Sequence, residues 1–338
     1  MFCGSISICR DRVPGVALAA LALLTSSCLL HDTSLSLRND KPRIVDVSPD
    51  VDTVDIHFPD STAFTLTVAD LNDSLLRVDT GSWPGSYVQE AVTLEEKRLI
   101  FYHGGRRLGK VFEDVLRIRD DQGAACSHAY RVRKLFVDPL DAIPQEWWHV
   151  VCADTSLGTV QVSTRIPSMK SVEFFFDTAS VRDSVQVSLI STFGLRGDFS
   201  WSLNYWLRND LVDDFELQFS CTTEPDTSVY TGERILLALA GRENSFTYRY
   251  RDAATSWEQA AEREMYYGPV RFMRRGEDLT IWHRPYGQPY RNLTDFNPLN
   301  YATDETVYIH VRMDVTDFGR EKFCDFFEFT ITEGEIVL

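Results

Sequence analysis

Apolar and polar residues alternate along most of the chain after about residue 42. Residues 44–47, 53–58 and 63–68 carry short stretches of this pattern, and residues 198–207 and 307–313 carry longer, more aromatic ones. A period of two places the apolar side chains on one face of a strand. The pattern therefore predicts an all-β protein, with short strands first and longer strands later.

Turn and breaker residues divide the pattern into two domains. Residues 120–123, Asp-Asp-Gln-Gly, predict a hairpin turn, since Gly tolerates positive φ and Asp bonds its own backbone. Pro139 and Pro144 predict a boundary, because proline cannot donate to a strand ladder. We expect domains at 42–139 and 146–338. Residues 253–265, rich in Ala, Glu and Arg, are the best candidate for a helix.

The first 27 residues predict an export signal. Arg10 and Arg12 precede an apolar run, residues 13–24, and then Thr-Ser-Ser lead to Cys28. A basic segment, an apolar segment and small residues are typical of a secretory signal. The run is shorter than the roughly 20 residues that span a bilayer. Residues 28–41 are polar and predict a tether.

The small residues before Cys28 resemble the lipobox of bacterial lipoproteins. The resemblance implies that Cys28 carries lipid and becomes the first mature residue of a cell-envelope protein. Leu29 follows it where Asp would signal inner-membrane retention, and this implies the outer membrane. A plain secretory signal with a coincidental cysteine is the alternative.

The charge balance excludes some partners. Lys and Arg number 34 and Asp and Glu number 50, giving a net charge of −16. Nucleic-acid binding needs a surplus of cations to contact phosphates, so we expect no such partner. Adhesion to anionic lipid by charge is disfavoured for the same reason. The lipid anchor is the expected contact with the membrane.

Four cysteines remain beyond the anchor: Cys126, Cys152, Cys221 and Cys324. An exported chain can form disulfides, and four cysteines allow three pairings. We expect Cys221 to pair with Cys324, since both lie at the ends of strands predicted in one domain. Four free thiols are the alternative. The lack of a CxxC spacing or a Cys/His cluster argues against zinc.

Three stretches of the second domain resemble the concanavalin A-like lectin/glucanase superfamily. They are LRGDFSWSL at 195–203, YGPVRFMRRGEDLTIW at 267–282 and CDFFEFTITEGEI at 324–336. The resemblance implies a jelly-roll sandwich over residues 146–338. In the first domain, residues 116–132 resemble the last hairpin of bacterial Ig-like or cadherin-like modules. About seven short strands in that domain also favour an Ig-like sandwich, which implies a spacer.

The sequence lacks the acidic motif that the catalytic members of the superfamily use. Glucanase chemistry needs two carboxylates close together, as in Glu-x-Asp-x-x-Glu on one strand. No such spacing occurs, so we expect a protein that is not an enzyme. A divergent glycoside hydrolase remains an alternative.

Alternation in the second domain predicts a binding patch. If the apolar positions of residues 199–205 face the core, the residues between them face outward. Aromatic faces beside planar polar groups suit sugar rings. The expected patch consists of Asn204, Trp206, Arg249, Trp282 and Arg284. Two alternatives stay open: the tryptophans cover a second sheet or loop, or a one-residue slip inverts the assignment.

A polar loop is a weak candidate for a metal site. Asp295, Asn297, Asn300 and Asp304 lie around Pro298, and oxygen-rich loops can hold Ca²⁺. An ordinary turn-rich loop is the alternative, and we expect no other cofactor.

The leading hypothesis is a lipid-anchored envelope protein whose jelly-roll domain binds carbohydrate, a polysaccharide or an envelope glycan. The alternative from another class is a structural lipoprotein that contacts envelope proteins.

Overall fold

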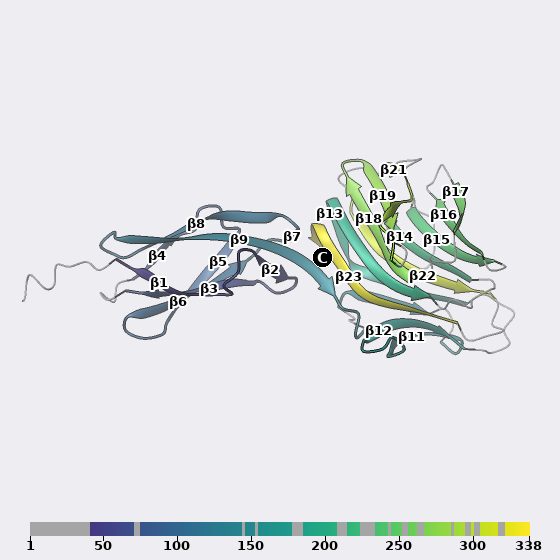
Figure 1. Ribbon diagram of the computed structural model, residues 1–338, viewed down its shortest axis with the longest axis horizontal. Coiled ribbons are helices and arrows are strands. Elements are labelled where there is room, and N and C mark those ends of the chain that lie inside the picture. Colours follow the sequence, from purple (N-terminus) through teal and green to yellow (C-terminus); the bar gives the residue numbers. More distant parts are fainter. Residues whose placement is uncertain are drawn as a thin grey trace, which may run out of the picture.

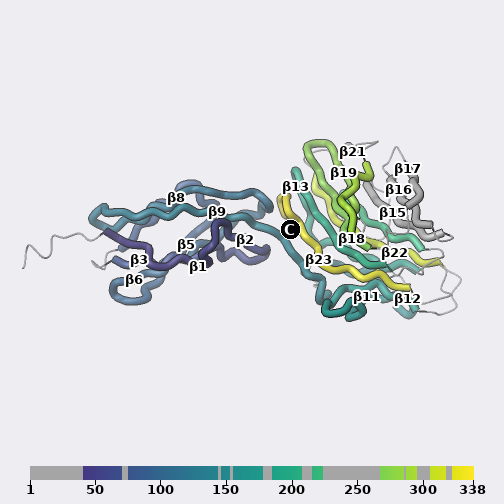
Figure 2. Tube along the Cα trace, in the orientation of Figure 1, coloured from purple at the N-terminus to yellow at the C-terminus, as the bar shows by residue number. Residues whose placement is uncertain are grey.

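The computed structural model describes residues 41–70, 75–143, 146–152, 155–177, 185–207, 215–223, 234–242, 245–251, 256–261, 267–284, 287–294, 299–300, 305–316 and 322–338. All regular structure in these residues is β-strand, which confirms the predicted all-β fold. No helix in the described parts of the chain is long and apolar enough to cross a membrane. Figures 1 and 2 show two elongated bodies arranged end to end.

The N-terminal body consists of two four-stranded sheets. One sheet has the order β1 (Arg43–Ser48), β3 (Thr62–Ala69), β6 (Glu96–His103) and β5 (Gly85–Ala91). The other has the order β2 (Val54–His57), β9 (Ala125–Asp138), β8 (Val111–Arg119) and β4 (Arg77–Asp79), with β2 parallel to β9. Apolar side chains from both sheets, including Phe64, Phe101 and Val132, form one core.

The predicted turn between β8 and β9 is confirmed. The Asp120 carboxylate accepts a hydrogen bond of 2.8 Å from the Ala124 N–H, and Gly123 has φ of 91°. This is the chemistry expected of Asp and Gly in a tight connection.

The C-terminal body has two sheets, which we call sheet I and sheet II. Sheet I contains β11 (Gly158–Ser163), β12 (Ser171–Phe176), β23 (Lys322–Val337), the second half of β13 (Val185–Leu207), β18 (Tyr267–Arg275) and β19 (Asp278–His283), with β20 (Arg291–Asn292) and β21 (Leu299–Asn300) beside β19. Sheet II contains β10 (Trp148–Cys152), the first half of β13, β22 (Val307–Val315), β14 (Phe215–Thr222), β15 (Arg234–Arg242), β16 (Ser245–Arg251) and β17 (Ser256–Ala261).

The two sheets pack against each other through alternating side chains of β13. Residues 199, 201, 203, 205 and 207 are all buried, as the alternation predicts. The Tyr205 ring lies 5.2 Å from that of Phe219 on sheet II, and Trp201 stacks on Phe272 at 4.5 Å. The residues between them, Asn204 and Trp206, therefore lie on the outer face of sheet I, away from the core.

A bulge in β23 breaks the expected alternation. Glu328 has φ of 57°, and the pairing with β13 shifts by one residue at this point. Phe329 lies opposite Leu203 and faces the core, while Phe327 lies opposite Asn204 on the outer face. The two phenylalanines therefore face opposite sides of the sheet although they are two residues apart, because a bulge inserts one residue and inverts the side chains beyond it.

The helix expected at 253–265 is also wrong. Its residues 256–261 form β17, which pairs with β16 from Arg251↔Ser256 to Phe246↔Ala261. Sheet pairing overrides the helix propensity of Ala, Glu and Gln here.

The two bodies share strands at their junction. Residues 136–138 of β9 pair with residues 329–331 of β23, and β7 (Arg107–Leu108) pairs with residues 334–335. Phe136 packs on Phe193 at 5.3 Å and on Phe329 at 5.8 Å. Figure 1 shows β9 running from one body into the other. Backbone hydrogen bonds and a common apolar cluster thus connect the bodies.

The expected disulfide is not formed. Cys324 lies opposite Leu207 in sheet I, whereas Cys221 lies between Ile235 and Ile309 in sheet II. Neither cysteine forms a disulfide, both are buried, and burial raises the pKa of Cys221 to about 12. No strand pairing brings the two cysteines together. Cys126 and Cys152 are free and half-buried.

Three predicted features lie outside the described residues: the export signal, Cys28, and the Asp295, Asn297 and Asp304 side chains of the loop expected to hold Ca²⁺. Within the part of the chain that the structure describes, no three His, Cys, Asp or Glu side chains gather as metal ligands.

Candidate functional site

The outer face of sheet I carries a row of polar and aromatic side chains that crosses four strands. Ser202 on β13 lies opposite Arg271, Arg271 lies opposite Trp282, and Trp282 lies opposite Asn292. Directly opposite residues of antiparallel strands share a face and contact each other. The register therefore places Trp282 of β19 beside Arg271 of β18.

Arg271, Trp282, Arg284 and Tyr290 form what we call the arginine–aromatic cluster. The guanidinium carbon of Arg271 lies 4.5 Å from the centre of the Tyr290 ring, and that of Arg284 lies 5.1 Å from it. The Trp282 indole N–H donates a 3.0 Å hydrogen bond to the Thr280 hydroxyl, which orients the indole. Arg284 is exposed and the other three are partly exposed, so a ligand can reach all four.

The cluster holds two cations, the guanidinium groups of Arg271 and Arg284. Among the described residues, no carboxylate forms an ion pair with Arg271 or Arg284. Cation–π contact stabilises each guanidinium by roughly 0.5–1 kcal/mol at exposed sites, but leaves its charge and most of its N–H donors available.

Asn204 and Trp206 continue the same face toward β23. The Asn204 amide donates to the Glu328 carboxylate at 3.4 Å. The Trp206 ring contacts the Phe323 ring edge-on, with centres 5.7 Å apart. Four of the five predicted patch residues thus lie on one outer face.

Arg249 is the predicted residue that the structure places elsewhere. It belongs to β16, opposite Ala238 and Glu258, and β16 is a strand of sheet II. The Arg249 side chain is not among the parts of the chain that the structure describes. Alternation along one strand assigns a face but not a sheet.

Glu173 and Asp325 form a second feature of this face, which we call the buried carboxyl pair. They lie directly opposite each other on β12 and β23, and Asp325 also lies opposite Trp206 on β13. Both side chains are buried, at 1% and 0% exposed. Acidic groups this deep in a protein require partners.

Hydrogen bonds and an ion pair surround the buried carboxyl pair. Glu173 accepts from the Gln161 amide at 2.6 Å and from the Arg165 guanidinium at 2.5 Å. Asp325 accepts from the Ser171 hydroxyl at 2.6 Å, while its other oxygen has no hydrogen-bond partner among the described residues. Burial raises the pKa of Asp325, and the charge of Glu173 raises it further. Asp325 thus retains a proton more readily than an exposed aspartate.

The guanidinium of Arg165 covers this end of the face. It lies 4.4 Å from the centre of the Phe323 ring while pairing with Glu173. Two adjacent carboxyls are what a glycoside hydrolase uses. Here the carboxyl groups of Glu173 and Asp325 are both buried, and each Glu173 oxygen accepts a hydrogen bond from Gln161 or Arg165.

Sequence reasoning missed Arg271 and Tyr290. The hairpin turn pairs Arg275 with Asp278, and counting back from it places Arg271 opposite Trp282. This signal was present in the sequence of residues 267–282. Tyr290 follows β19 through a loop, and no periodicity marks it.

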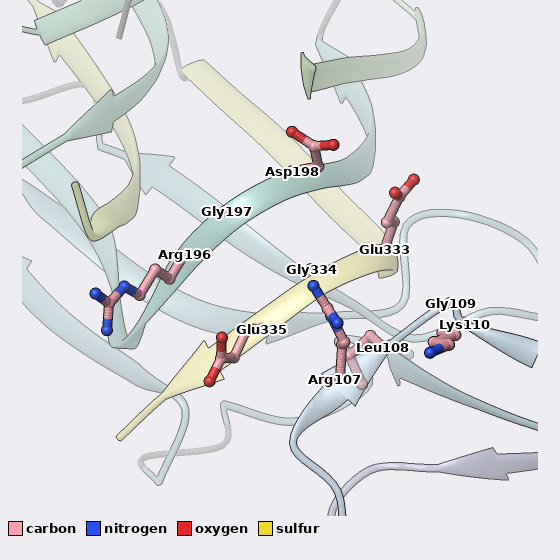
Figure 3. A pocket seen from close by; sticks show the side chains of 10 residues that line it. All are labelled: Arg107, Leu108, Gly109, Lys110, Arg196, Gly197, Asp198, Glu333, Gly334 and Glu335. Atoms are coloured by element: carbon pink, nitrogen blue, oxygen red, sulfur yellow. The ribbon is translucent and has the colours of Figure 1, made fainter. Parts of the chain in front are cut away.

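A separate pocket lies at the junction of the two bodies. It is a cavity of about 400 Å³, lined by Arg107, Leu108, Gly109, Lys110, Arg196, Gly197, Asp198, Glu333, Gly334 and Glu335 (Figure 3). Arg196, Glu335 and Arg107 lie opposite one another in register. Glu333 pairs with Arg275, and Asp198 accepts from the Gly276 N–H. Cations and anions alternate around this cavity, so its charge does not select a ligand class.

Comparisons with known proteins give structural likeness only. No family model matches, and no curated protein matches. The chain is similar to lectin II from Ulex europaeus, with 10% identity over 60% of this chain and 98% of that chain and a TM-score of 0.42. It is similar to a Bacteroides ovatus GH16 protein in complex with G4G4G3G product, with 10% identity, 58% and 99% coverage and a TM-score of 0.41.

A third similar structure is the metal-free lectin I-B4 from Griffonia simplicifolia. Identity is 8%, coverage is 58% of this chain and 98% of that chain, and the TM-score is 0.41. Likeness at these values carries no conclusion about what this chain binds.

Proposed function

We propose that the protein binds carbohydrate on the outer face of sheet I. The observation that carries the proposal is the arginine–aromatic cluster, where Trp282 and Tyr290 are reachable beside two guanidinium groups. Sugar rings offer C–H faces that contact aromatic rings and hydroxyls that accept from arginine. A solvent-facing row of side chains of this kind suits a chain of sugars better than a small enclosed ligand.

We propose further that the protein works in the cell envelope, anchored by lipid on Cys28 in the outer membrane. The basic, apolar and small-residue order of residues 1–27 supports this location. The N-terminal body acts as an Ig-like spacer between the tether and the concanavalin A-like body. Mass spectrometry of the mature N-terminus tests the anchor: an acylated Cys28 supports it, and an unmodified residue at another cut site contradicts it.

The proposed binding is not catalytic. The buried carboxyl pair is the closest acid pair that we find on the face, and Arg165 and Gln161 occupy Glu173. A substrate reaches these groups only if Arg165 moves. Incubating the protein with a polysaccharide that it retains tests this: product release that disappears in Asp325→Asn would instead support a glycoside hydrolase.

Affinity electrophoresis of the purified protein in gels containing polysaccharides tests carbohydrate binding. We expect retardation by at least one polysaccharide, and loss of the retardation in Trp282→Ala. Tyr308→Ala is the matched control, because Tyr308 is a partly exposed aromatic on β22 of sheet II. A folded protein that no polysaccharide retards contradicts the proposal. Crosslinking to an envelope protein would then favour the structural lipoprotein.

A further inference from the structure

The charge of the arginine–aromatic cluster differs from that of the whole chain. The protein carries a net charge of −16, yet the open part of the outer face presents Arg271 and Arg284 together. An acidic protein repels anions at long range, whereas this cluster attracts them locally. The positive charge of the cluster therefore favours a ligand that carries negative charge.

Three other described arginines of the C-terminal body form ion pairs with acids. Arg165 pairs with Glu173, Arg275 with Glu333 and Arg312 with Asp314. Arg271 and Arg284 instead stack on one tyrosine ring and form no ion pair with a described carboxylate. This contrast separates them from arginines that serve only to balance nearby charge.

The geometry brings two like charges to one ring. Arg271 lies opposite Trp282, and Arg284 follows Trp282 by two residues on the same strand face. Like charges beside one ring disfavour each other, and an anion that both guanidiniums contact offsets that repulsion. A guanidinium group donates two parallel hydrogen bonds to a carboxylate or another flat oxyanion, which an ammonium group cannot do.

We propose that the ligand is an acidic glycan whose anionic group binds Arg271 and Arg284 while its sugar ring contacts Trp282. The proposal rests on carbohydrate binding by this face and adds the ligand class. The shared chemistry is an oxyanion carried on a sugar, supplied either by the carboxylate of a uronic acid or by a sulfate ester.

Isothermal titration with three sets of oligosaccharides of equal length tests the proposal: neutral glucans, oligouronates and sulfated glucans. We expect the purified protein to bind at least one acidic set about tenfold or more tightly than the neutral set. Tighter binding of the oligouronates indicates that the protein recognises a carboxylate, and tighter binding of the sulfated glucans indicates a sulfate ester. Arg271→Met with Arg284→Met should abolish that preference, so that the double variant binds the acidic and neutral sets with affinities within about twofold of each other.

Arg275→Met is the matched control, because Arg275 lies on the same strand as Arg271 but pairs with Glu333. It should keep the preference, and thermal melting of each variant confirms that it folds. Equal affinity for neutral and acidic sugars overturns this inference and leaves carbohydrate binding standing, as does a preference that survives in the double variant. Failure to bind any of the three sets overturns both.

Discussion

On the outer face of sheet I, charged groups gather at two places that differ in their exposure to solvent. Toward β19, Arg271 and Arg284 are open to solvent and stack on Tyr290. Toward β12, Glu173 and Asp325 are buried beneath Arg165 and held by hydrogen bonds. The same sheet thus presents cations to solvent at one end and encloses anions at the other.

The difference shows which charges are available for recognition. Enclosed carboxylates are balanced within the protein, so altering them should change stability. Open guanidiniums gain little from the fold, so altering them should change binding. The following variants separate these two effects.

Removing the partner of a buried acid should have the largest effect. Arg165→Met leaves the Glu173 carboxylate buried without its cation, and we expect a loss of about 2–3 kcal/mol in the free energy of unfolding. Arg275→Met removes an equally short but exposed pair and should cost less than about 1 kcal/mol. Chemical denaturation measures both. Equal losses would mean that burial does not distinguish the two pairs.

Truncating the aromatic ring at the open end should weaken binding rather than stability. Trp282→Ala should lower affinity for a retained glycan by about tenfold, equivalent to about 1.4 kcal/mol. The effect of Trp206→Ala on affinity should be smaller, since its ring packs on Phe323 and lies away from the cluster. Titration of both variants checks the order, and the reverse order would place the binding site near β23.

The buried carboxyl pair should make stability depend on pH. The pKa of Asp325 is raised by burial and by Glu173. The folded protein then holds a proton that the unfolded chain releases, so stability falls as pH rises from the usual aspartate pKa through the raised one. Asp325→Asn should remove this pH dependence. Its stability relative to the unaltered protein should therefore be greater at pH 7 than at pH 4. Melting curves of both proteins at the two pH values measure it, and parallel changes would contradict it.

Salt should have the smallest effect, and only at the open end. Raising ionic strength from about 0.05 to 0.5 M should weaken acidic-glycan binding a few-fold, because exposed charges are screened beyond the Debye length. The stability difference between Arg165→Met and the unaltered protein should change less, since that pair is largely covered. Binding that does not respond to salt would argue against the arginines as anion ligands.

Strict alternation made the core of the C-terminal body predictable. Apolar and polar residues alternate strictly from Phe199 to Tyr205, and every apolar position of this stretch is buried. The turn at Gly123 was also predictable, since glycine tolerates the positive φ that this residue adopts. Where one face of a strand is apolar, the sequence constrains its orientation strongly.

Two kinds of information were absent from the pattern. The bulge at Glu328 inverts Phe327, and nothing in the local sequence marks it. The opposition of Glu173 and Asp325 depends on pairing between strands about 150 residues apart in the chain, which local periodicity cannot specify. The placement of Arg249 in sheet II failed to follow from alternation for the same reason.

β23 follows every other described strand in the chain, yet it lies between β12 and β13 and also pairs with β9 of the N-terminal body. A ribosome must therefore release residues 322–337 before sheet I can close. Until then the nascent chain carries unpaired strand edges on both sides of that gap. Unpaired edges of this kind are prone to aggregation, and pairing of β23 removes them.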